Sequence, residues 1–119
     1  MNKRILKFRI WYYDQKKFDY NVEFKDFAQY SFPLYWCEVQ QYSGMTDRKG
    51  KEIYDGDIII IGDRIREVVF DMGMFYIDEG YGDVVPISEI DNIIEIVGNV
   101  FENSELLNNE QTIKISSLE

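Results

Sequence analysis

The chain has 119 residues, of which 45% are hydrophobic and 16% aromatic, and this fits one folded domain rather than two. Its net charge of −9, from 22 acidic and 13 basic residues, argues against non-specific binding to nucleic acid or anionic membranes, because both repel such a field. No segment of the sequence approaches the roughly 18 consecutive apolar residues of a membrane-spanning helix. The opening "MNKRILKFRI" does not resemble a signal peptide, and Cys37 has no second cysteine to pair with, so we expect a cytoplasmic protein.

The first segment, "ILKFRIWYY", alternates between two sets of side chains, as expected of a half-buried β-strand. A polar turn, "DQKK", and a second alternating segment, "FDYNVEF", follow it. We therefore predict a hairpin with strands at residues 4–13 and 18–24. Lys7, Arg9 and Trp11 share one face of its first strand.

The next segment, "KDFAQYSFPLYW", has no stable period, and we expect a connecting loop with a helical turn around Asp26 to Tyr30. "LYWCEVQQY" then predicts a strand. Cys37 is interpreted as a small buried hydrophobic residue, because the chain has no histidine to activate a thiolate. The absence of histidine also removes a common general base, so we do not expect an enzyme.

The most unusual stretch is "YSGMTDRKGKEIYDGDIIII", residues 42–61. Gly44, Gly50 and Gly56 are expected to serve turns, and Asp57 to accept hydrogen bonds from free backbone N–H groups. The branched run Ile58–Ile61 indicates a strand covered on both faces.

Short strands with tight turns continue through the rest of the chain. Gly62-Asp63 is a plausible hairpin turn, and "MFYI", "VVPI" and "IIEIVGNVF" are further strand candidates. "SEIDN" is expected to form a helical turn capped by Ser88, and "ENSELLNNEQ" a short helix capped by Asn103 or Ser104. Residues 52–101 therefore have the pattern of a small, curled antiparallel barrel.

Several patterns in the sequence suggest a functional site but also have a simpler interpretation. Asp47, Asp55, Asp57 and Asp63 lie close in sequence, but an EF-hand would need ligands where Arg48 and Lys49 stand. The loop "GKEIYDGD" opens a strand rather than a helix, unlike a phosphate-binding loop. Carboxylate pairs of the glycosidase kind cannot be judged without distances. We expect no metal, no cofactor and no catalytic residue.

Nucleic-acid binding is the most serious alternative. Small barrels bind single strands by stacking bases on aromatic side chains in a basic groove, and Lys7, Arg9, Trp11 and Tyr42 could form such a face. In the simpler interpretation, Trp11 packs at an edge or interface, while the stems of Lys7 and Arg9 cover apolar surface. The net charge favours the simpler interpretation.

Three segments together resemble the YopX family of small phage and prophage proteins: "ILKFRIWYYDQKKF", the stretch at 42–61, and "IEIVGNVFENSELL". The resemblance covers about residues 3–107, and Met45, Ser104 and Ile10 depart from the usual family residues. It implies a mainly β protein with an SH3-like barrel, encoded by a bacteriophage or prophage and acting in a bacterial host cell. It brings no catalytic residues.

We therefore expect one domain at 1–107, with an N-terminal hairpin and strands at 4–41, an SH3-like antiparallel barrel at about 42–101, one or two short helical turns, and a tail at 108–119. The preferred function is non-enzymatic contact with another protein. The partner would be a second copy, since the basic first strand and the acidic end from Glu102 to Glu119 are complementary, or a host or phage protein. Mimicry of DNA by the acidic surface is a further possibility.

Overall fold

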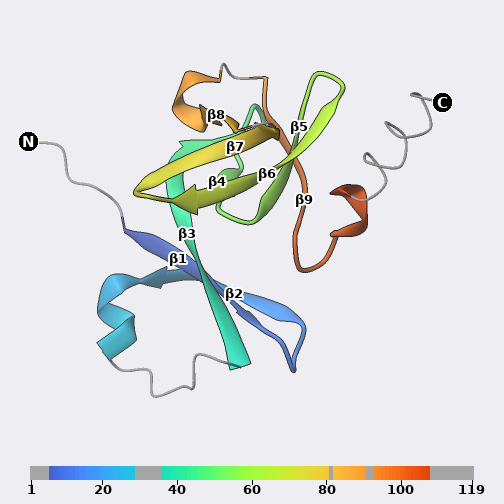
Figure 1. Ribbon diagram of the computed structural model, residues 1–119. Helices are drawn as coiled ribbons and strands as arrows, with labels where there is room; N and C mark the ends of the chain where they lie inside the picture. Colours follow the sequence, from blue (N-terminus) through green and yellow to red (C-terminus); the bar gives the residue numbers. More distant parts are fainter. Residues whose placement is uncertain (1–5, 29–35, 81, 91–92, 108–119) are drawn as a thin grey trace, which may run out of the picture.

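The computed structural model describes residues 6–28, 36–80, 82–90 and 93–107 (Figure 1). It is mainly β, as predicted, and its strands form two antiparallel sheets. One sheet has the order β2-β1-β3-β4 and the other the order β8-β7-β6-β5-β9. The strands are β1 (Lys7–Tyr12), β2 (Lys17–Glu23), β3 (Cys37–Thr46), β4 (Glu52–Tyr54), β5 (Asp57–Ile61), β6 (Arg64–Asp71), β7 (Met74–Gly80), β8 (Asp83–Pro86) and β9 (Glu95–Asn99).

The local predictions of hairpins are confirmed. β1 pairs with β2 through a polar turn, with a register shift between Phe8 and Ile10, and β5 pairs with β6 across Gly62-Asp63. Turn-forming residues join the strands of each pair. Ile58 and Ile59 are fully buried and Ile61 is nearly so, which confirms that this run is covered on both faces.

The strands expected to form a small antiparallel barrel at about 42–101 are divided between the two sheets and do not close into a barrel in the described part of the chain. Among the described residues, the ladders end at β2 and β4 in one sheet and at β8 and β9 in the other. β3 explains the difference, because its first half pairs with β1 and its second half with β4. It therefore crosses the boundary expected near residues 41 and 42. Its register shifts between Tyr42 and Thr46, where Gly44 has a φ of +86°, so Gly44 lies at an irregularity within a strand rather than in a turn.

The helical segments are short. The 3₁₀ helix η1 (Phe24–Ala28) begins slightly before the predicted turn, whose last residues lie outside the described ones. The 3₁₀ helix η3 (Ile87–Glu89) begins after Pro86, so the prediction of Ser88 as its cap is wrong: Ser88 lies inside the helix. Residues 105–107 are helical, and the predicted tail lies outside the described residues. No helix in the described ranges is long and apolar enough to cross a membrane.

Two hydrophobic clusters stabilise the fold. The larger is formed by Ile53, Ile59, Val68, Ile77 and their neighbours, and the strands from β4 to β9 supply most of it. The smaller lies on the outer face of the first sheet, where Ile10, Val22 and Cys37 pack with Phe8 and Phe27. Both faces of the first sheet are therefore packed against other residues. This cluster covers one face, and the rest of the molecule contacts the other.

Gly56 is required at the junction of the two sheets. Its φ is +87°, and a Cβ atom built there would lie 1.9 Å from Nε2 of the buried Gln40. Its N–H donates to the carbonyl of Val68, and its carbonyl accepts from the N–H of Val100. The residue thus combines a left-handed backbone with a close approach that only glycine permits.

We predict that Gly56→Ala destabilises the protein more than Gly50→Ala does. Gly50 also has a positive φ, but nothing lies within 4 Å of its added Cβ, so its substitution costs only the backbone term of about 1–2 kcal/mol. Gly56→Ala must also displace Gln40, which adds about 1–3 kcal/mol. Urea denaturation of both variants measures the difference, and equal losses of stability would contradict the steric argument.

Candidate functional site

Arg9 of β1, expected on a binding face, is buried between the two sheets and only 3% exposed. Its Nη1 lies 2.9 Å from Oδ1 of Asp57 on β5, and its Nε donates a 2.7 Å hydrogen bond to Oε1 of Gln40 on β3. The guanidinium carbon lies 4.5 Å from the centre of the Phe18 ring and 4.9 Å from that of Tyr54. These contacts satisfy the charge without water.

Asp57 completes this arrangement from the other sheet. Its Oδ2 accepts a 2.8 Å hydrogen bond from the N–H of Tyr54, as predicted for its backbone role, while Oδ1 binds Arg9. Burial raises the pKa of the Asp57 carboxyl, whereas the Arg9 charge and the Tyr54 N–H oppose that rise. The sequence analysis identified both residues but not their pairing.

The other members of the predicted binding face are also engaged within the fold. Trp11 is 6% exposed, and its ring stacks on Phe101 with centroids 5.1 Å apart and planes at 6°. Lys7 forms an ion pair with Glu52 and lies over the ring of Tyr42, which is buried. Of the residues considered for nucleic-acid binding, Arg9 is therefore covered by Asp57 of the second sheet and Trp11 by Phe101 of the segment after β9. Trp11 packs within the fold, as in the simpler interpretation, but Lys7 and Arg9 form ion pairs, which that interpretation did not include.

The four aspartates that suggested a metal site lie in different environments. Asp47 accepts hydrogen bonds from the N–H groups of Lys49, Lys51 and Ile96, and holds its loop against β9. Burial alone would raise the pKa of Asp47, but these three donors outweigh it and lower the pKa below its usual value. Asp63 is exposed in the β5–β6 turn. Within the described part of the chain, no group of three His, Cys, Asp or Glu side chains is placed to hold a metal ion.

Asp55 lies beside the buried pair and is partly buried itself. Its carboxylate accepts a hydrogen bond from the N–H of Gln41, and its carbonyl accepts one from Arg9. Burial raises the pKa of Asp55 to about 6, in spite of the Gln41 N–H and the Arg9 charge, which favour the ionised form. Cys37 is buried as predicted, and burial raises the pKa of its thiol, which makes the thiolate unfavourable.

Aromatic side chains become exposed where the first sheet extends past the second. Tyr13, just beyond β1, is 49% exposed, and Trp36, just before β3, is 58% exposed. The N–H of Tyr13 donates to the carbonyl of Trp36, the Tyr13 hydroxyl donates to Glu38, and the Tyr13 ring packs edge-on against Phe101. We call Tyr13, Trp36 and Phe101 the aromatic end. Sequence reasoning missed it because the pairing of β1 with β3 is not local.

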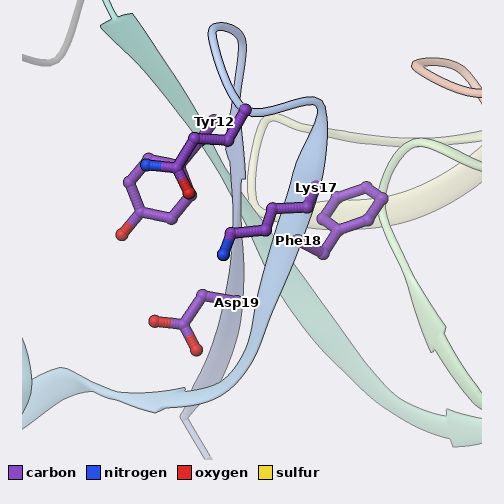
Figure 2. A pocket seen from close by; sticks show the side chains of 5 residues that line it. Tyr12, Lys17, Phe18 and Asp19 are labelled. Carbon is purple, nitrogen blue, oxygen red and sulfur yellow. The ribbon is translucent and has the colours of Figure 1, made fainter.

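A shallow pocket of about 390 Å³ lies beside the aromatic end, at the turn of the first hairpin (Figure 2). Its lining residues are Tyr12, Gln15, Lys17, Phe18 and Asp19. Figure 2 shows Lys17 and Asp19 on the same side of β2, with Phe18 directed to the other side. The ammonium and the carboxylate offset each other, so the lining does not favour a ligand of either charge.

We predict that Arg9→Met costs about 3–5 kcal/mol of stability, because it leaves the Asp57 carboxylate buried without its partner. Lys25→Met, which breaks the exposed pair of Lys25 with Glu23, should cost less than about 1 kcal/mol. Combining Arg9→Met with Asp57→Asn should restore part of the loss. Chemical denaturation of all the variants measures these terms, and additive losses in the double variant would refute the coupling.

Asp55 gives a prediction for the dependence of stability on pH. An aspartate in the unfolded chain has a pKa of about 3.9. Since the folded pKa is raised to about 6, the stability contributed by protonated Asp55 is fully present below about pH 4 and is lost as pH rises through about 6. Asp55→Asn cannot ionise, so its stability relative to wild type should increase between about pH 4 and 6 and then level off. Urea titrations across this range test it, and a pH-independent difference would contradict it.

Comparison with known proteins agrees with the resemblance noted in the sequence. A crystal structure of protein EF1440 from Enterococcus faecalis matches with a TM-score of 0.64 and 19% identity, over 88% of this chain and 99% of that one. At this identity the similarity establishes a shared fold. No curated protein matches the chain. The family model described as YopX protein matches residues 3–108, and the chain therefore belongs to the YopX family.

Proposed function

We propose that this chain is a phage or prophage accessory protein that acts by contact between proteins, and that the aromatic end is its contact surface. The observation that carries the proposal is the exposure of Trp36 and Tyr13 on neighbouring strand ends. The Tyr13 N–H donates to the Trp36 carbonyl, and the Tyr13 ring packs against Phe101. Aromatic side chains of this kind provide large contact areas with little loss of conformational entropy, and they dominate the energetics of protein interfaces.

A second copy of the chain is the partner we propose for this surface. Attraction between the basic first strand of one copy and the acidic end of another gives weaker support than the sequence suggested. Lys7 and Arg9 of that strand are already paired with Glu52 and Asp57 inside the fold. Near the aromatic end, however, basic and acidic residues are mixed, although exposed Glu102 directly follows Phe101. Asp14 and Lys16 lie in the adjacent turn, with Lys17 beyond it and Glu38 bound to Tyr13. Two copies can therefore meet here without the repulsion that the net charge of −9 would cause elsewhere.

Single-stranded nucleic acid is a poorer partner for this structure. The hypothesis depended on Arg9 and Trp11, which are 3% and 6% exposed and engaged with Asp57 and Phe101. Stacking of a base on Trp11 would require displacement of the Phe101 ring that already stacks on it.

The test is sedimentation velocity over about a hundredfold range of concentration, where mass action drives association. Wild type should change from monomer to dimer as its concentration rises. Trp36→Ser should need a concentration at least about tenfold higher than wild type to dimerise to the same extent. Ile93→Ser is a matched control, because Ile93 is 56% exposed and lies outside the aromatic end. It should behave like wild type. A wild-type protein that stays monomeric throughout the range, or equal effects of the two substitutions, would contradict the proposal.

A further inference from the structure

The β6–β7 turn contains a methionine in a backbone conformation that disfavours it. Asp71 pairs with Met74, so Met72 and Gly73 form a two-residue loop, with φ values of +53° and +75°. Positive φ at both central positions defines a type I′ turn, for which Asn-Gly and Asp-Gly are preferred. The Cβ atom of methionine clashes in this region, and its side chain has no local hydrogen bond to offer the turn. The residue preference of the turn therefore does not explain why position 72 is a methionine.

The needs of the core do not explain it either. Met72 is 92% exposed, so it buries almost nothing within the fold. Phe70 is 37% exposed at the base of the turn, and its ring packs against that of Phe75 with centroids 4.4 Å apart. We call Met72, Phe70 and Phe75 the Met72 knob. Met72 is disfavoured in this turn and contributes almost no burial to the folded chain. Such a residue points to a contact with another molecule.

The charge around the knob restricts the chemistry of what it contacts. Exposed Asp71 directly precedes Met72. Residues 67–107 contain ten acidic residues and no lysine or arginine, and basic side chains from outside this range pair with only two of those acids in the described structure, Glu79 and Glu95. Such a surface is repelled by anionic membranes and by another copy of itself, but it complements a basic surface. Met72 is 92% exposed in a two-residue turn, and methionine is flexible and polarisable, so its side chain fits an apolar pocket of adaptable shape.

We propose that the Met72 knob inserts into an apolar pocket with a basic rim on a different protein. This is independent of self-association through the aromatic end, because Figure 1 places the β6–β7 turn and the β1–β2 turn on different sides of the molecule. The chain would then bind a second copy through the aromatic end, beside the β1–β2 turn, and a different protein through the β6–β7 turn.

The first experiment separates recognition from folding. Met72→Asn puts a preferred residue into the type I′ turn, so its melting temperature should equal or exceed that of wild type. Asp63→Asn, in the exposed β5–β6 turn, is the matched control. A melting temperature of Met72→Asn below that of wild type would show that Met72 supports the fold and would overturn the proposal.

The second experiment identifies the occupant. A photo-crosslinking phenylalanine derivative is placed at position 72, and as a control at position 63, in bacterial cells that express the full chain. The adduct expected at position 72 alone is a basic protein. Once purified, that protein should bind wild type and Asp63→Asn equally, more weakly at high salt, and at least about tenfold more weakly when the chain carries Met72→Asn. An adduct with a second copy, an adduct with lipid, the same adduct at both positions, or no adduct would overturn the proposal.

Discussion

A buried ion pair between the two sheets constrains the arrangement of the described strands. Arg9 and Asp57 lie 48 residues apart, and both side chains are 3% exposed. Removing two charges from water is costly, and only good geometry with further hydrogen bonds offsets that cost. Gln40 and the N–H of Tyr54 supply those bonds, while Phe18 and Tyr54 exclude water from the guanidinium. The pair therefore requires β1, β3, β4 and β5 to assemble in one arrangement.

This requirement explains several features around the pair. Gly56 precedes Asp57 and has no side chain because Gln40 occupies that space. Asp55 is drawn into the same region, where burial raises its pKa. Trp11 and Phe101 then stack over the next part of the β1 face, so the segment after β9 also packs on the first sheet. The "DGD" motif thus joins the sheets as well as turning the chain.

The sequence predicts the local part of this structure well. Alternation and turn residues identify the first hairpin, the covered strand Ile58–Ile61 and the turn at Gly62-Asp63, because these depend on neighbours in the chain. The family was recognised from the same segments. Alternation places Arg9 and Trp11 opposite Ile10 on the strand, but it cannot tell whether that face meets water or a second sheet. The open arrangement was missed for a related reason, since β3 changes partner between Gln41 and Tyr42 and both pairings are non-local.

Ion pairs within the fold also affect the charge of the outer surface. Lys7, Arg9 and Arg66 each bind an acidic partner within the fold, which leaves many other carboxylates exposed. Exposed apolar groups are then found mainly at strand ends and turns, as at Trp36 and Met72. Both of our functional proposals rest on such positions, where folding alone does not account for the residue.

Amide hydrogen exchange, measured residue by residue under native conditions with increasing denaturant, tests most directly whether the buried pair makes the two sheets one cooperative unit. We predict that the slowest amides of β1 and β3 and those of β5 and β6 open with the same free energy in wild type. A first sheet that opens separately, at a clearly lower free energy than the second, would contradict the account.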